Sequence, residues 1–330
     1  HPVVQRIVLD WRRLAMRELE SPNTRTLIAC SGGADSTALL LAIGAAAPGQ
    51  IVVGHVAHDL RPEAETRADR DAVAALAAKL DVPFIERSVR VPPGNAESHA
   101  RRLRYAALAE MARETASNII ATGHHADDQF ESILMALIRG TGLDGLRGIA
   151  PRRRLKQENA GANGPALIRP MLGVTHAECE ALCRDAGIEW RTDATNLSGD
   201  RLRSKLRIGP IAELIRARPG AAANASNAAS ILREASRLVR DRATEVFADA
   251  HEWPRDALRY QPSIILGTGL RRAFHNLTGG QGADRLGRKQ LTPVIRAIKD
   301  RVTDPRIFEW PRAVRLTVAA NQVTLQKIAP

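Results

Sequence analysis

The fold is decided by residues 26–36, which read Thr-Leu-Ile-Ala-Cys-Ser-Gly-Gly-Ala-Asp-Ser. The apolar run 26–30 predicts a buried strand, and the Ala- and Leu-rich segment 36–47, which stops at Pro48-Gly49, predicts a helix. Glycines between a strand and a helix let the backbone approach a phosphate, and the helix start supplies free N–H groups and the positive end of the dipole. The stretch therefore predicts a phosphate-binding loop.

The alternation of strand and helix patterns continues to about residue 139. Further strands are predicted at 51–56, 82–89 and 118–123, and further helices at 62–80, 96–115 and 126–139. This order predicts an α/β fold, Rossmann-like, in which a parallel sheet has helices on both faces. Ligands bind such sheets at the carboxyl ends of the strands. Polar motifs follow three of the strands there, so we expect one shared site at 31–36, 55–61 and 123–131.

The last third of the chain has a different character. An Ala- and Asn-rich segment at 219–229 indicates a domain boundary, and we predict a catalytic domain over 1–215 and a smaller, mainly helical α+β domain over 216–330. Amphipathic helical patterns occupy 225–250 and 283–301, and strand-like alternation occupies 314–325.

Charge is concentrated in the same region. The net charge is +12, with 28 Lys and Arg against 25 Asp and Glu in residues 1–210, and 20 against 11 in residues 211–330. A basic C-terminal domain favours a polyanionic partner such as RNA. The alternative is a general drift of composition toward arginine. Aromatic residues make up 3% of the chain, which argues against base stacking as the main binding mode.

Cysteine content and hydropathy bear on the compartment. Three cysteines, Cys30, Cys179 and Cys183, are too few for a disulfide framework and fit a reducing compartment, so we expect a cytoplasmic protein. No apolar run approaches the roughly 20 residues that cross a bilayer, so no membrane association is expected. The sequence does not fix the oligomeric state, and a homodimer is one assembly compatible with it.

The loop residues are the predicted ATP-binding set: Ser31, Gly32, Gly33, Ala34, Asp35 and Ser36. No Gly-Lys-Ser/Thr follows, so this is not a Walker A loop. A carboxylate beside phosphates needs a cation, so Asp35 implies Mg²⁺ bound with ATP. Residues 140–145 match G-x-G-x-x-G, but they follow a helix rather than a strand, which indicates a helix-terminating turn instead of a dinucleotide site.

Two motifs rich in His and Asp accompany the loop. Residues 55–61 read His-Val-Ala-His-Asp-Leu-Arg, and residues 124–131 read His-His-Ala-Asp-Asp-Gln-Phe-Glu. Such side chains could orient a nucleophile, stabilise leaving pyrophosphate or hold a transition metal. Asp127 and Glu131 could instead cap a helix.

The Arg-rich helix 96–115 offers a further cation. Of its arginines we favour Arg104, because Tyr105 and Leu108 indicate that the helix packs nearby, and Arg104 would then hold AMP or an RNA phosphate. The alternative is a solvated surface arginine.

Taken in order, these motifs resemble one family. The segments SGGADS (31–36), HVAHDLR (55–61), ARRLRY (100–105), GHHADDQFES (123–132) and RGTGLDGLRGI (139–149) resemble the tRNA(Ile)-lysidine synthetases of the ATP-pyrophosphatase, or PP-loop, superfamily. Residues 168–172 (IRPML) and 189–196 (EWRTDATN) are similar to later segments of that family. The resemblance covers about residues 24–215, and beyond them only length and basic character agree.

The resemblance implies an activity. Family members use ATP to adenylate the C2 oxygen of the wobble cytidine in an isoleucine tRNA with a CAU anticodon, and the amine of free L-lysine then displaces AMP to give lysidine. By this resemblance Asp35, Arg104, His124 and Asp128 belong to the catalytic centre, with Asp128 expected to accept the lysine ammonium. Arg61, Arg203 and Arg207 are expected RNA or nucleotide contacts. Ser204 stands where the family commonly has Asn, and Ser132 where it has Thr.

Other classes share the ATP loop. A tRNA thiolase usually carries sulfur on a cysteine or an iron–sulfur cluster, but no C-x-x-C pair is present. Amidating or argininosuccinate-type synthetases would leave the basic C-terminal domain unexplained. A catalytically idle RNA-binding relative would not need the intact Asp35, His124 and Asp128.

Overall fold

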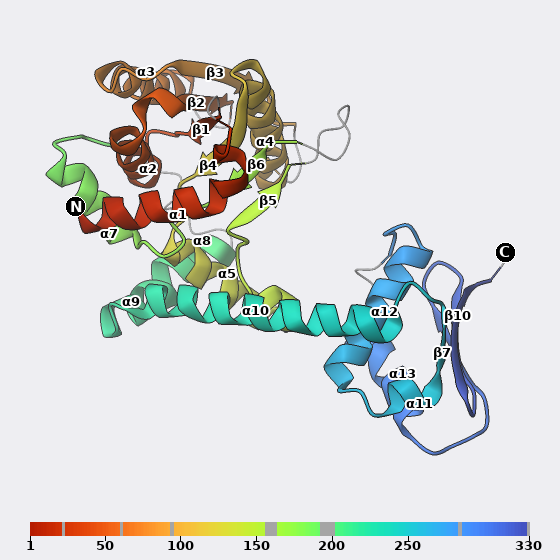
Figure 1. Cartoon of the computed structure of the whole chain (residues 1–330). Coiled ribbons are helices and arrows are strands. Elements are labelled where there is room, and N and C mark those ends of the chain that lie inside the picture. The colour runs from red at the N-terminus through yellow and green to blue at the C-terminus, as the bar shows by residue number, and fades with distance from the viewer. Residues whose placement is uncertain are drawn as a thin grey trace. The chain divides into compact units, whose positions relative to one another are not determined.

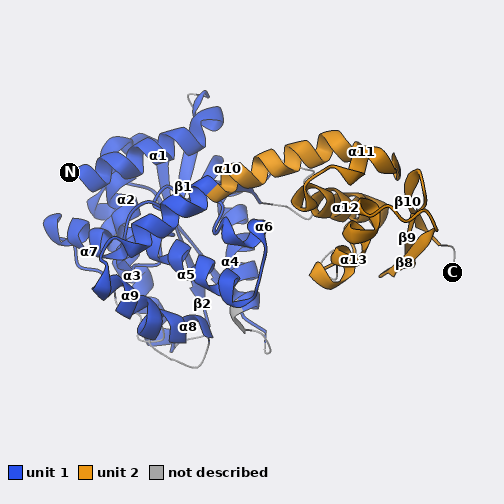
Figure 2. Cartoon of the chain, turned by 90° about the horizontal axis from the view of Figure 1, so that it is seen from below, with its two compact units in different colours: residues 1–231 blue, residues 232–330 orange. Residues whose placement is uncertain are grey.

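The computed structural model describes residues 1–21, 24–59, 62–92, 96–155, 164–191, 202–282 and 286–328. Contacts divide the chain into two compact units, His1–Ile231 and Leu232–Pro330 (Figure 2). The division falls inside the long helix α10 (Ala221–Phe247), whereas the predicted boundary at 215/216 lies in α9 (Ala212–Ala217). Each unit is described separately below.

The first unit is built on a six-stranded sheet in the order β3-β2-β1-β4-β6-β5 (Figure 1). All neighbouring pairs are parallel except β5–β6, so the predicted parallel sheet is confirmed. The antiparallel edge strand β5 was not predicted, because its three arginines carry no apolar alternation. The strands are β1 (Arg25–Ala29), β2 (Ile51–His58), β3 (Phe84–Val89), β4 (Ser117–Thr122), β5 (Arg152–Arg154) and β6 (Ala166–Ile168).

Helices cover both faces of this sheet, as predicted. Alternate strand residues point to opposite sides: Leu27 packs with helix α4, while Ile28 packs with α1, α2, α3 and α7. Trp11 fixes α1 to the sheet, since its indole Nε1 donates to Thr26 Oγ1 at 3.1 Å. The helices are α1 (Pro2–Leu19), α2 (Ala34–Ala46), α3 (Glu63–Lys79), α4 (Ala96–Glu114), α5 (Ala126–Ile138), α6 (Leu143–Leu146), α7 (His176–Asp185) and α8 (Leu202–Leu206).

Two short helical turns complete the first unit, a 3-10 turn at Pro48–Gln50 and a π-helical turn at Arg207–Ile211. Helix α5 ends just before Gly140, whose φ of +63° lies in the left-handed region that glycine favours. Residues 140–142 therefore form a helix-terminating turn, as the sequence indicated, and residues 143–146 form the short helix α6.

The second unit is a smaller α+β unit, as expected. Its antiparallel sheet has the order β7-β10-β9-β8. The alternation over 314–325 is two strands rather than one, β9 (Val314–Val318) and β10 (Gln322–Lys327), joined by a turn. The other elements are β7 (Glu252–Pro254), β8 (Arg306–Trp310), α11 (Arg255–Arg259), α12 (Ser263–Leu277) and α13 (Arg288–Lys299). Phe247, Trp253, Phe274 and Trp310 lie in its core.

Among the described residues, the longest and most apolar helices fall short of what a membrane-spanning segment requires.

Candidate active site

The loop at residues 31–36 joins β1 to α2. Gly32 has a φ of +89°, a backbone angle that residues with a side chain rarely adopt. Gly33 is the N-cap of α2. Ser36 Oγ accepts from the Ser31 N–H at 3.1 Å and donates to the Gly33 carbonyl at 3.1 Å, so the two serines brace the turn. The first helical hydrogen bond comes from the Thr37 N–H to that same carbonyl at 3.0 Å.

The N–H groups of Ala34, Asp35 and Ser36 precede that first helical bond. In the described part of the chain they have no hydrogen-bond partner. Unpaired N–H groups at a helix start form an anion-binding site. The loop therefore has the geometry of the predicted phosphate cradle.

The end of β4 closely approaches the start of α2. A Cβ at Gly123 would lie 3.0 Å from the Asp35 carbonyl oxygen and 3.0 Å from the Ser36 nitrogen. Only glycine fits without a shift at these backbone distances. Because His124 and His125 follow directly, this contact brings the second His-Asp motif to Asp35.

Both carboxylate oxygens of Asp35 face a histidine. His176 Nδ1, at the start of α7, lies 2.7 Å from Oδ1, and His125 Nε2 lies 3.4 Å from Oδ2. Burial raises the pKa of Asp35, but the hydrogen bonds and charges of His125 and His176 outweigh it and hold the pKa far below its usual value. Asp35 is therefore a carboxylate at neutral pH.

His125 is the cation at the centre of this cluster. Its Nδ1 lies 3.3 Å from Asp127 Oδ2, and its Nε2 lies 3.5 Å from Asp128 Oδ2. Burial lowers the pKa of His125, but Asp128, Asp127 and Asp35 together raise it to about 10. The side chain is thus an imidazolium among three carboxylates.

Asp127 and Asp128, at the start of α5, also accept hydrogen bonds from backbone N–H groups. Asp128 Oδ2 accepts from the His125 N–H at 3.1 Å, which caps α5, and Asp127 Oδ2 accepts from the His176 N–H at 2.8 Å. His176 is the first residue of α7, so Asp127 caps a helix, as one of the sequence alternatives held. The helix it caps lies 49 residues further along the chain.

His124 points into a different environment. Its Nδ1 lies 2.9 Å from Thr122 Oγ1. Burial lowers the pKa of His124 well below its usual value, opposed by Asp128 and reinforced by Arg169, Arg101 and Arg104. His124 is therefore a neutral imidazole, able to accept or donate one hydrogen bond, whereas the adjacent His125 is charged.

Arg104 projects from α4 near the Tyr105 ring, 5.8 Å from guanidinium carbon to ring centroid. The residue is exposed, but its guanidinium lies among protein groups, and desolvation together with Arg101 and Arg203 lowers its pKa. Asp128 acts on the same group in the opposite direction. Arg104 therefore shares an electrostatic environment with Asp128 and His124.

Glu131 binds two of the predicted contact arginines. Its side chain is 2% exposed and forms ion pairs with Arg203 and with Arg207, whose Nε and Nη2 lie 3.0 and 2.8 Å from Oε2. Arg207 Nη2 also lies 3.5 Å from Asp128 Oδ1. The alternative that Glu131 only caps a helix is wrong, because residues from α8 and the following turn supply its partners. Arg61 lies outside the described residues, as do residues 192–201.

The sequence did not single out three residues that hold the site together. His176 contacts Asp35 from a helix start 141 residues further along. The Arg191 N–H donates to the Gly32 carbonyl at 2.9 Å, and Arg191 Nε donates to the buried Asp69 at 3.0 Å. No local motif marks His176 or Asp69, and the segment 189–196 that contains Arg191 gave no sign of a contact with the loop, because tertiary folding alone brings these residues there.

His55, in the first His-Asp motif, has a structural role. It is 4% exposed, and its Nδ1 lies 3.0 Å from the Cys30 carbonyl, so it connects β2 to the residue that follows β1. Burial lowers its pKa.

Comparison with known proteins agrees with this geometry. The family model described as "PP-loop domain" matches residues 10–213. The tRNA(Ile)-lysidine synthase of Bordetella pertussis is 36% identical over 74% of this chain and 76% of its own length. The chain belongs to the tRNA(Ile)-lysidine synthase family. Another member, from Symbiobacterium thermophilum, is 39% identical over 94% of this chain and 66% of its own length.

Coverage of these lysidine synthases is partial. The match to the Solibacter usitatus relative covers 58% of this chain but 41% of the length of that protein, at 36% identity. Among solved structures, the U34-tRNA thiolase NcsA from Methanococcus maripaludis shares the fold, with a TM-score of 0.55 and 16% identity over 70% of this chain and 79% of that one.

The phosphate cradle raises the question whether the site also fits Mg²⁺. Mg²⁺ takes hard oxygen ligands, usually one or two carboxylates with substrate phosphates. Asp35 offers such an oxygen beside the loop, and it is ionised. One ligand atom each from Asp35, His125 and His176 lie within 4.8 Å of one another, a mixed set whose imidazoles suit a transition metal better. Asp35 therefore fits Mg²⁺, provided that His176 yields its position.

The cysteines lack the exposed, ionised thiol that a sulfur carrier requires. Cys30, Cys179 and Cys183 are all buried, and burial raises the pKa of each thiol, that of Cys183 to about 12. A thiol of this kind carries almost no nucleophilic thiolate at neutral pH.

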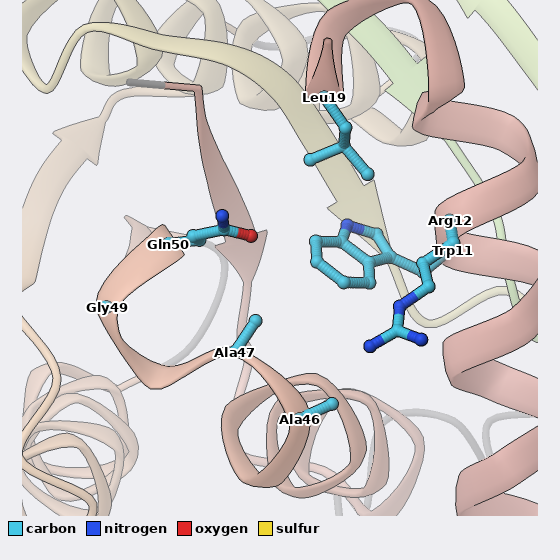
Figure 3. Close-up of a pocket in the computed structure, with 7 residues that line it drawn as sticks. All are labelled: Trp11, Arg12, Leu19, Ala46, Ala47, Gly49 and Gln50. Carbon is cyan, nitrogen blue, oxygen red and sulfur yellow. The ribbon is translucent and has the colours of Figure 1, made fainter. Parts of the chain in front are cut away.

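A cavity of about 490 Å³ lies away from this site (Figure 3). It is lined by Trp11, Arg12, Leu19, Ala46, Ala47, Gly49 and Gln50. Ala46 is the last residue of α2 and Gln50 directly precedes β2, so the cavity sits at the opposite end of α2 from the phosphate loop. It is not the nucleotide site.

Proposed function

We propose that the chain modifies an isoleucine tRNA by ATP-dependent lysidine formation. The observation that carries the proposal is the position of the ionised Asp35. Asp35 lies in the phosphate loop, within hydrogen-bonding range of His176 and close to His125. Family membership gives the reaction class, and this site supplies the groups that it needs.

In this proposal the unpaired N–H groups of Ala34, Asp35 and Ser36 bind the phosphates of ATP. Asp35 holds Mg²⁺, which neutralises phosphate charge when bound. Developing negative charge in a transition state is stabilised most by preorganised donors and cations. Arg104 supplies a cation for the transferred AMP or for an RNA phosphate.

The reaction has two steps. The C2 oxygen of the wobble cytidine attacks the α-phosphorus of ATP and pyrophosphate leaves, which makes that oxygen a good leaving group. The amine of free L-lysine then attacks C2, and AMP leaves with the oxygen. His124 is neutral, so it can accept a proton or donate one hydrogen bond at the reacting groups. Asp128 is ionised and is assigned to the lysine ammonium.

The remaining contacts belong to the same proposal. Arg61, Arg203 and Arg207 contact RNA or nucleotide, and the exposure of Arg203 (38%) and Arg207 (45%) leaves each guanidinium partly open beside Glu131. The basic domain over 216–330 binds the tRNA body. A cytoplasmic location and a homodimer remain predictions.

The test is transfer of labelled lysine. The full chain is incubated with ATP, Mg²⁺, radiolabelled lysine and an unmodified isoleucine tRNA with a CAU anticodon. We expect ATP-dependent incorporation into RNA that falls at least 100-fold in Asp35→Ala. Absence of incorporation by the wild-type chain, with tRNA and ATP both bound, would contradict the proposal.

A further inference from the structure

An unusual set of arginines surrounds Tyr105. The guanidinium carbons of Arg153, Arg101 and Arg104 lie 4.8, 5.2 and 5.8 Å from the ring centroid. Arg169 Nη2 lies 3.5 Å from the Tyr105 hydroxyl. We call Arg101, Arg104, Arg153 and Arg169 the Tyr105 cluster. Its members come from α4, from β5 and from the residue that follows β6.

Arg169 is the buried member of the Tyr105 cluster. It is 3% exposed, and its Nη1 donates to the Ala150 carbonyl at 2.6 Å. Its Nε is buried and has no hydrogen-bond partner among the described residues. A buried charge with an unsatisfied donor is costly unless something compensates it.

Protein acids do not compensate the cluster. In the described ranges, Arg101, Arg153 and Arg169 form no ion pair with a carboxylate, whereas the neighbouring Arg152 and Arg154 both bind Glu18. Desolvation lowers the pKa of Arg169, and repulsion by Arg153 and Arg101 lowers it further. The cations therefore repel one another where an anion would relieve the strain.

The position of the cluster connects it to the candidate active site. Strands β4 and β6 are parallel neighbours with Ala121 paired to Ile168, so Arg169, directly after β6, and His124, shortly after β4, lie at the same edge of the sheet. Consistent with this position, Arg169, Arg101 and Arg104 each lower the pKa of His124. Guanidinium groups bind phosphate oxygens with paired hydrogen bonds, and Tyr105 can donate its hydroxyl to the same oxygen.

We infer that Arg101, Arg153 and Arg169, arranged around Tyr105, bind a phosphate group beside His124. That phosphate comes from the RNA backbone next to the reacting nucleotide or from ATP. The inference rests on the proposed function only for the identity of the RNA.

The test compares two double variants of the full chain. Arg101→Gln/Arg153→Gln removes two of the three arginines named in the inference. Arg104, which is already assigned to the candidate active site, and the buried Arg169 stay in place, so that neither that site nor the core is disturbed. Arg102→Gln/Arg113→Gln is the matched control, since it removes the same charge from exposed positions on α4. Equal melting temperatures would establish that both variants fold.

Binding of CAU isoleucine tRNA is measured over a series of salt concentrations, and binding of ATP with Mg²⁺ is measured by calorimetry. If the phosphate belongs to RNA, we expect about tenfold weaker tRNA binding than in the control and a salt slope reduced by about 1, with ATP affinity unchanged. If it belongs to ATP, the loss of about tenfold appears in ATP affinity instead.

Affinities for both ligands equal to those of the control would overturn the inference. Neither measurement needs lysine transfer. A wild-type chain that transfers no lysine, combined with a response in either binding experiment, would therefore refute the proposed function and leave the phosphate site standing.

Discussion

Arg169 in the first unit and Arg255 in the second are both buried, at 3% and 1% exposure, but their surroundings differ. All three nitrogens of the Arg255 guanidinium donate, and of their six hydrogen bonds five go to backbone carbonyls and one goes to Asp300 Oδ1 at 2.8 Å. Among the described residues, the Arg169 guanidinium donates to one carbonyl and, over a longer distance, to a tyrosine hydroxyl, and its Nε has no partner. A satisfied buried arginine holds a fold together, and an unsatisfied one indicates a missing ligand.

The largest effect is expected from Arg255→Met. This substitution leaves the carbonyls of Ala297, Ile298 and Val302 without their donor inside the second unit. Because several buried acceptors lose partners together, the unfolding free energy of that unit should fall by about 3–5 kcal/mol. Chemical denaturation followed by hydrogen exchange within 232–330 measures it. A loss below about 1 kcal/mol would contradict the structural role assigned to Arg255.

His125 is an intermediate case, a buried cation whose partners are carboxylates. The pKa of His125 is raised to about 10 in the folded protein. Its contribution to stability is therefore complete at pH values below the pKa of the unfolded chain, near 6.5, and is lost as pH rises toward 10. We expect His125→Gln to destabilise the first unit by roughly 1–3 kcal/mol at pH 6. The difference from wild type should shrink as pH rises to 9, in melting curves recorded at each pH. A difference independent of pH would contradict the assigned charge.

The contribution of Asp35 to stability changes with pH in the opposite direction. Its pKa is held below the usual value, so its contribution to stability is present above about pH 4 and is lost as pH falls. Together the two groups predict that the Asp35–His125 pair stabilises most between about pH 4 and 6.5.

Arg169→Met should cost less than Arg255→Met. The substitution deprives only the Ala150 carbonyl and the Tyr105 hydroxyl of a partner, and it removes a charge that repels its neighbours. We expect the unfolding free energy to change by less than about 1.5 kcal/mol, while phosphate binding weakens about tenfold. Denaturation and tRNA or ATP binding are measured on the same preparation. A loss of stability matching that of Arg255→Met would assign Arg169 to the scaffold.

The smallest effect belongs to the exposed Arg102. Arg102→Gln should change stability by no more than about 0.5 kcal/mol and leave tRNA and ATP affinity within twofold of wild type. A larger loss of affinity would mean that net charge on α4, rather than the arrangement around Tyr105, governs binding.

The sequence predicts the elements between residues 26 and 139 well, because the strands are apolar runs and most of the helices have Pro or Gly near their ends. The N-terminal helix α1 was not predicted. The phosphate loop and the second His-Asp motif are visible for the same reason. Their apposition through Gly123 follows from parallel topology, which brings strand ends to one edge of the sheet.

What the sequence does not contain is long-range pairing. His176 and Arg191 reach the loop from segments whose local sequence does not indicate that contact, and Glu131 forms ion pairs with two arginines more than 70 residues further along the chain. Which of two adjacent histidines carries charge also depends on such neighbours: carboxylates surround His125, while burial and arginines surround His124. In the second unit the strands are short and separated by turns, so the sequence showed a strand pattern only over residues 314–325.

The central claim is that the loop and Asp35 activate RNA by adenylation. The most direct measurement uses ATP labelled in its α-phosphate, with CAU isoleucine tRNA and Mg²⁺ but without lysine. The account predicts label on the tRNA with the wild-type chain, release of that label as AMP when lysine is added, and no labelled RNA with Asp35→Ala. Lysine incorporation without any labelled RNA intermediate, or ADP as the nucleotide product, would contradict it.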